Sequence, residues 1–190
     1  SGMIMPIMQW VNWLGYVGIA VVGGLVTLAV IQNPPPQARE DIEIAGLQTF
    51  EGLSANHVST PVDYEQSPPV GGDHASAWLN CGVYTEPVPN ENAVHALEHG
   101  AAWVAYDSEA LSQEQVDALR TALPAAYVVL APYEGLDSPI VLSAWQAQVA
   151  VDSPEDERIE QFVAEYWQSP DAPEPGAACT GGLDAPGRIA

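Results

Sequence analysis

Residues 90–106 read NENAVHALEHGAAWVAY. A helix over residues 91–99 would place His95 and His99, which are four residues apart, on one face and within reach of a single metal ion. The apolar run over residues 101–106 has the length and composition of a short strand. This stretch therefore predicts a helix that carries polar ligands, followed directly by a strand.

Further elements on either side complete a small domain. Ser112 and the acidic turn after it predict a capped helix over residues 113–123, which Pro124 ends. Pro154 at a first helical position predicts a last helix that runs through Trp167. Further strands are expected at residues 57–62, 82–88, 127–131, 140–144 and 146–151. This order predicts an α+β fold with a small mixed or antiparallel sheet and two or three helices, preceded by one transmembrane helix.

All four histidines of the chain lie between positions 57 and 99. Imidazole is the commonest protein ligand for transition metals, and nitrogen-rich sites suit zinc or copper better than calcium or magnesium. His74 ends the loop SPPVGGDH, in which prolines fix the approach and glycines permit unusual backbone geometry. The predicted ligands are His57, His74, His95, His99 and Glu98, with Asp73 as an alternative source of oxygen. The alternative is that the histidines only satisfy buried backbone groups.

No catalytic residue is predicted. The spacing His95-x-x-Glu98-His99 matches the inverted zincin pattern, but those enzymes need a further acidic ligand downstream and a much larger body. The sequence contains no nucleophile elbow, phosphate-binding glycine loop or dinucleotide fingerprint. A binding domain is therefore favoured over a free-standing enzyme.

Residues 10–31 form an uncharged apolar run, which is long enough to cross a bilayer as a helix. A cleaved signal peptide is the competing interpretation, but a basic leader and a small-residue cleavage site are missing. Aromatic side chains expected at the membrane interface are Trp10, Trp13 and Tyr16. Small side chains that would let another helix pack closely are Ala20, Gly23, Gly24 and Thr27. The run predicts a single-pass anchor in the lipid bilayer of the cytoplasmic membrane.

The chain is strongly acidic, with 25 Asp and Glu against four arginines and a net charge of -21. Such a charge excludes nucleic acid as a partner and gives no polybasic hold on anionic lipid. It would attract cations or a basic protein. The alternative is that it only keeps the domain soluble.

Cys81 and Cys179 are the only cysteines. A disulfide between them would close a loop of about 100 residues, which stabilises a fold by up to about 4.7 kcal/mol in the chain-entropy model. It would place the domain in an oxidising compartment, on the periplasmic or extracellular side. The alternative is two unrelated buried thiols.

Composition divides the chain into four parts. Residues 1–33 are the anchor, residues 34–48 a proline-rich linker, residues 49–168 the globular domain and residues 169–190 a Pro/Gly-rich tail with little regular structure of its own.

Three strings carry a resemblance to a known family: HVxxPVxYxQxPPxGGxH, WxxCGVY and PVxNExAVHxLEHGAxWVxY. They resemble the bacterial domain-of-unknown-function family 3105 over about residues 50–145, a range that includes all four histidines. Its members are typically single-pass or lipid-anchored proteins outside the cytoplasm. The resemblance implies that the histidine-bearing segments form the family's characteristic site, and it supplies no reaction.

Two functions fit these observations. The first is a membrane-anchored metal-binding domain outside the cytoplasm, holding a copper or zinc ion. The second is an accessory subunit of a larger respiratory or photosynthetic membrane complex, in which the histidines are structural and the acidic body contacts other subunits or a basic protein. Metal analysis tests the first function, and co-purification after mild detergent extraction tests the second.

Overall fold

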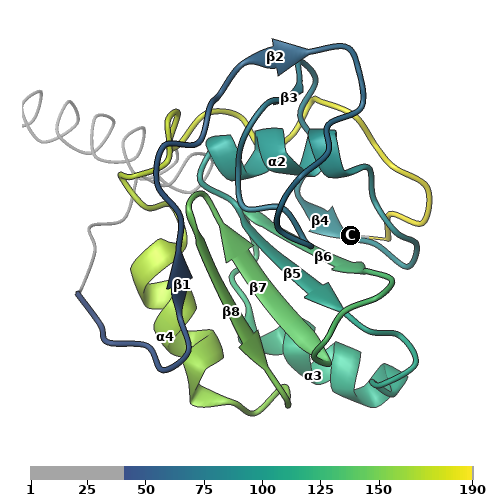
Figure 1. Ribbon diagram of the computed structural model, residues 1–190. Helices are drawn as coiled ribbons and strands as arrows, with labels where there is room; N and C mark the ends of the chain where they lie inside the picture. The colour runs from purple at the N-terminus through teal and green to yellow at the C-terminus, as the bar shows by residue number, and fades with distance from the viewer. Residues whose placement is uncertain (1–40, 190) are drawn as a thin grey trace, which may run out of the picture. The chain divides into compact units, whose positions relative to one another are not determined.

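The computed structural model describes residues 41–189, and a six-stranded mixed sheet forms the centre of this domain (Figure 1). The strands in spatial order are β1 (Gln48–Thr49), β8 (Ala147–Val151), β7 (Ile140–Ala144), β5 (Ala102–Tyr106), β6 (Val128–Pro132) and β4 (Gly82–Val83). The pairs β1–β8, β8–β7 and β7–β5 are antiparallel, whereas β5–β6 and β6–β4 are parallel. The predicted α+β class with a mixed sheet is confirmed.

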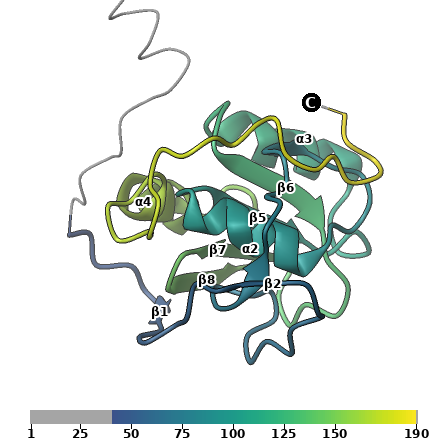
Figure 2. The same ribbon diagram turned by 90° about the horizontal axis from the view of Figure 1, so that it is seen from above.

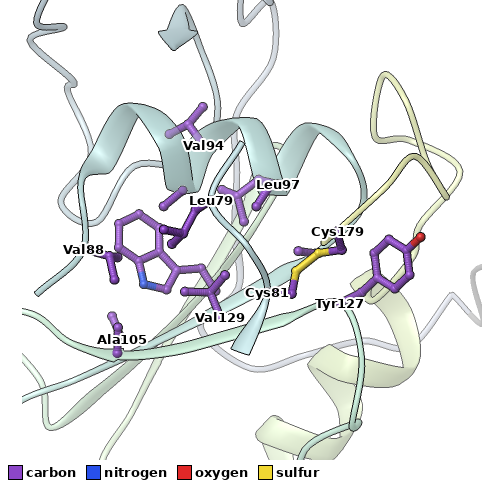
Figure 3. Close-up of a cluster of buried hydrophobic side chains, with 14 of the residues drawn as sticks. Leu79, Cys81, Val88, Val94, Leu97, Ala105, Tyr127, Val129 and Cys179 are labelled. Carbon is purple, nitrogen blue, oxygen red and sulfur yellow. A yellow bond between two sulfur atoms is a disulfide. The ribbon is translucent and has the colours of Figure 1, made fainter. Parts of the chain in front are cut away.

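Helices cover both faces of this sheet. Every residue of β5 is buried, and its side chains alternate between two hydrophobic clusters. Trp103 packs in the cluster beneath α2 (Asn90–Glu98), part of which Figure 3 shows. Val104 packs in the opposite cluster with side chains of α3 (Gln113–Ala122) and α4 (Glu157–Tyr166). A strand covered on both faces is uniformly apolar, as the sequence of β5 is.

The helix α2 ends where the sequence changes to glycine. Gly100 has φ +90°, a backbone conformation that favours glycine, and its N–H donates to the Leu97 carbonyl at 2.9 Å. A Cβ at this position would lie 2.6 Å from Nε2 of Gln168. The chain can therefore turn directly from α2 into β5, and the helix is held against the sheet.

The other two helices differ in how well their starts were predicted. Ser112 caps α3 with a complete capping box, as predicted. The prediction for the last helix was wrong at its start, because α4 begins at Glu157 and not at Pro154. Asp156 caps it by accepting a hydrogen bond from the Arg158 N–H at 2.9 Å. The preceding residues form a turn, in which the Asp156 N–H donates to the Ser153 carbonyl.

Two predicted strands are much shorter in the structure. The strand expected at residues 57–62 is reduced to β2 (His57–Val58), since Pro61 has no N–H and the Val62 N–H donates to the Glu91 carboxylate at 3.0 Å. The strand expected at residues 82–88 is reduced to β4. β2 pairs in parallel with β3 (His74–Ala75) in a separate two-stranded sheet.

The C-terminal tail contains no helix or extended strand up to residue 189, yet it packs firmly on the domain. A disulfide joins Cys81 to Cys179, whose Cα atoms lie 5.3 Å apart, and the Cys81 N–H donates to the Cys179 carbonyl at 2.7 Å. Leu79 and Leu183 form an isolated parallel bridge. The folded unit thus extends beyond residue 168, and the predicted disulfide is confirmed (Figure 3).

Within residues 41–189, none of the helices has the length and apolar character needed to cross a membrane. The predicted anchor at residues 10–31 lies outside the described residues. The same holds for its expected interface and helix-packing residues, namely Trp10, Trp13, Tyr16, Ala20, Gly23, Gly24 and Thr27.

Removing the disulfide should destabilise the domain. We expect the double substitution C81S/C179S to lower the free energy of unfolding by about 2–5 kcal/mol. Without the covalent link the unfolded chain has more conformational freedom, so unfolding becomes more favourable. Urea denaturation followed by circular dichroism measures this difference. An unchanged midpoint would show that the packing of the tail does not depend on the covalent link.

The cap of α4 should make stability depend on pH. The Arg158 side chain hydrogen-bonds the Asp156 carboxylate and holds its pKa below the ordinary value. A carboxyl group whose pKa is lowered by folding stabilises the fold above its unfolded pKa, and this contribution is lost as pH falls through the folded pKa. The free energy of unfolding of the native chain should exceed that of D156N at neutral pH. The gap should narrow as the pH falls below about 4, as measured by urea titrations at each pH, and a gap independent of pH would contradict the ion pair.

Candidate metal centre

The helix α2 supplies three polar side chains at its C-terminal end. His95 and Glu98 are three residues apart and therefore lie on one face, with 3.6 Å between His95 Nε2 and Glu98 Oε2. His99 follows as the C-cap residue. All three side chains are buried. A buried carboxylate beside buried imidazoles is costly unless it is compensated.

The short strands β2 and β3 supply the other two histidines. Their parallel register places His57 directly beside His74, and the His74 N–H donates to the Asn56 carbonyl at 3.0 Å. The two rings lie 5.0 Å apart between centroids. Both strands lie on the side of α2 that faces away from the six-stranded sheet (Figure 1), and β2 lies next to α2 in Figure 2. Residues distant in sequence therefore meet at one place.

Three imidazoles converge on one oxygen of Glu98. Oε2 lies 3.0 Å from Nε2 of His74, 3.6 Å from that of His95 and 3.8 Å from that of His57. One ligand atom from each of these four residues lies within 4.8 Å of every other. Bonds of 2.0–2.1 Å to a tetrahedral ion would separate its ligand atoms by about 3.3 Å. The spacing in the cluster brackets this value, so the four residues fit a metal ion.

The other ring nitrogens are fixed by backbone carbonyls. Nδ1 of His74 lies 2.8 Å from the Gly72 carbonyl, and Nδ1 of His95 lies 2.7 Å from the Ala75 carbonyl. A carbonyl oxygen only accepts, so in both rings Nδ1 donates and Nε2 faces Glu98. Metal-binding histidines are oriented in this way by a hydrogen bond from their second nitrogen.

His74 and Glu98 are in hydrogen-bond contact. Because Nδ1 of His74 already donates, the 3.0 Å contact between Nε2 and Oε2 requires one proton on either atom. A metal ion would take the place of this proton and would bind both atoms. The cluster is thus satisfied without an ion and is also arranged to accept one.

A hydrogen-bonded loop holds the two strands together. The Asp73 carboxylate accepts hydrogen bonds from the side-chain amide of Asn56 at 2.9 Å and from its backbone N–H at 3.3 Å. The Tyr64 hydroxyl donates to the Asp73 carbonyl at 2.7 Å. Hydrogen bonds from Ser54 and Asn56 lower the pKa of Asp73. Asp73 therefore positions the strand of His74 and does not supply an oxygen to the cluster.

Burial keeps His95 neutral. Loss of solvent lowers the pKa of its imidazole to about 4, and the nearby rings of His99, His74 and His57 add to this effect, while the hydrogen bond to Ala75 opposes it. Neutral imidazole is the form that binds metals, so this ligand needs no deprotonation at neutral pH.

Two tryptophans pack against the cluster, and one of its residues is exposed to solvent. Trp145 packs edge-on against His74 with 6.1 Å between ring centroids, and Trp78 lies 5.8 Å from His95. Side chains of His74, His95 and Glu98 are at most 5% exposed, whereas that of His57 is 50% exposed. Solvent therefore reaches the cluster at His57.

His99 lies beside this cluster and contacts a different carboxylate. Its Nε2 is 3.7 Å from Oε2 of Glu174, and its Nδ1 lies 2.7 Å from the Ala178 carbonyl. His99, Glu98 and Glu174 form a second group whose ligand atoms are within 4.8 Å of one another. Sequence reasoning did not find Glu174, which lies in the proline-rich tail, and the predicted disulfide was the only signal that this tail returns to the body.

The comparisons with known proteins give a family and no function. The family described as "Protein of unknown function (DUF3105)" matches residues 57–181, which is more than half of the chain and includes all six residues of the two groups. No curated protein matches the chain, and no solved structure matches it. The strings that carry the resemblance are thus those that build the histidine cluster, and the chain belongs to the DUF3105 family.

Proposed function

We propose that this protein binds a transition metal ion, zinc or copper, through His57, His74, His95 and Glu98. The convergence of three Nε2 atoms on one buried carboxylate oxygen carries the proposal. Imidazole and carboxylate donors suit these ions.

Charge balance supports a cation at this place. The described ion pairs of Glu98 are all with imidazoles, whereas Arg158 pairs with Asp156 and Arg188 pairs with Asp184. When no ion is bound, the proton that Glu98 shares with His74 balances the Glu98 charge, and ion pairs buried in this way are costly to desolvate. A divalent ion would supply two positive charges without requiring any histidine to become protonated.

The same arrangement favours binding over catalysis for this ion. Three imidazoles and a carboxylate complete four-coordinate zinc, whereas catalytic zinc usually keeps one position for water or substrate. The proposed role is therefore to hold or carry the ion.

We further propose that the domain works outside the cytoplasm, held to the membrane by residues 10–31. The disulfide between Cys81 and Cys179 supports this placement, since such bonds persist in oxidising compartments. The uncharged apolar sequence of residues 10–31 supports the anchor.

The substitution E98Q tests the metal proposal most directly. Glutamine keeps the size of the side chain and can still hydrogen-bond His74, but it removes the charge and the strong metal ligand. We expect the affinity of the metal-free full chain for Zn²⁺ to fall at least about 10- to 100-fold, because loss of even an indirect partner of a metal ligand has this effect. Competition against a chromophoric chelator measures the affinity.

E134Q provides the matched control, since Glu134 is an exposed carboxylate on the loop after β6. It should bind Zn²⁺ as the native chain does. If the native chain fails to compete with the chelator for either Zn²⁺ or Cu²⁺, or if E98Q binds as tightly as E134Q, the metal proposal is wrong.

A further inference from the structure

His99 was predicted as a ligand of the same ion as the other histidines, but the structure gives it different neighbours. It groups with Glu98 and Glu174, while His57, His74 and His95 group around Glu98. Glu98 is the one residue that both groups share. The rings of His95 and His99 are adjacent, with 4.6 Å between their centroids.

The tail is fastened to the end of α2 at this place. The Glu174 N–H donates to the Glu98 carbonyl at 3.0 Å, and the Gly176 N–H donates to the His99 carbonyl at 3.1 Å. The Ala178 carbonyl accepts from Nδ1 of His99, and the disulfide of Cys179 follows immediately. These contacts fix the backbone at Glu174 and in the residues that follow it.

His99 is oriented as a ligand rather than as a partner in an ordinary hydrogen bond. Its side chain is 4% exposed, and the hydrogen bond to Ala178 makes Nδ1 the donor. Nε2 then faces Glu174 Oε2 at 3.7 Å, which is too long for a hydrogen bond. An ion between these two atoms would bind both of them.

We propose that His99 and Glu174 form a second metal position and that Glu98 bridges the two ions. This inference rests on the proposed function, because Glu98 also belongs to the first position. Carboxylate-bridged pairs of metal ions in proteins lie about 3.5–4 Å apart. Trp78 packs against the rings of both His95 and His99, at 5.8 and 5.4 Å between centroids.

The second position differs from the first in its openness. It has one imidazole and two carboxylates, and the Glu174 side chain is 60% exposed. Three protein ligands leave room for water or an exogenous ligand on the ion, which is the arrangement of reactive metal sites. The first ion would then be the fixed one, and the second would be the one that exchanges ligands with solvent.

Counting bound ions in E174Q tests the second position. We expect the full chain, stripped of metal and equilibrated with excess Zn²⁺, to retain two ions per chain by elemental analysis. E174Q should retain one, because the first group does not contain Glu174. E134Q serves again as the control of equal charge and should retain two. Circular dichroism checks that the exposed substitution leaves the fold intact.

Cu²⁺ gives an independent readout of the shared carboxylate. Two bridged Cu²⁺ ions should couple magnetically, so the paramagnetic resonance signal of the native chain should account for less than its total copper. In E174Q the signal should account for all of the bound copper.

The possible outcomes separate the two proposals. If the native chain and E174Q each retain one ion and E98Q retains none, the second position is overturned and the first stays intact. A native chain that retains no ion would overturn the proposed function together with this inference. Two ions in the native chain with uncoupled copper would overturn the bridging role of Glu98.

Discussion

The carboxylate of Glu98 is the constraint around which the rest of the site is arranged. It is buried, and it lies in the last turn of α2, where the aligned peptide dipoles already place partial negative charge. Both conditions disfavour an anion. The protein surrounds this oxygen with imidazoles from three segments, and two of these rings are fixed by backbone carbonyls so that Nε2 points inward. A cation at the same point would relieve the burial and the dipole together.

The sheet makes this arrangement rigid. Trp103 and Ala105 of β5 pack in the cluster beneath α2, and Gly100 allows the chain to pass from the helix into β5 without a longer loop. The helix end that carries Glu98 is therefore fixed relative to the core. The short strands β2 and β3 gain their position from pairing with each other and from the loop that Asp73 and Asn56 hold together.

Local sequence patterns predicted the helices and strands better than they predicted which side chains come into contact. The capping box at Ser112 and the buried strand β5 were readable because they depend on neighbours in sequence. The spacing of His95 and His99 predicted that both histidines bind one ion. In the structure, His95 shares its cluster with Glu98, which was also a predicted ligand, while His99 lies in the neighbouring group. The register that pairs His57 with His74 involves strands of two residues each, which leave no periodicity to detect.

Long-range placement was the part that the sequence could not supply. Glu174 lies about 75 residues beyond His99 in a segment without helical or strand pattern, and its backbone is fixed by hydrogen bonds to the end of α2. Only the cysteine pair pointed to that contact. The start of α4 was misplaced for a different, local reason. Pro154 is a common first helical residue, but Asp156 provides the cap that the helix uses.

The unequal exposure of the four cluster residues has a kinetic consequence. The side chains of His74, His95 and Glu98 are buried, whereas that of His57 is half exposed and lies on a strand of only two residues. A competing ligand from solvent would meet an ion in this cluster first at His57. An ion in this cluster would therefore have a long residence time, set by three ligands that water does not reach.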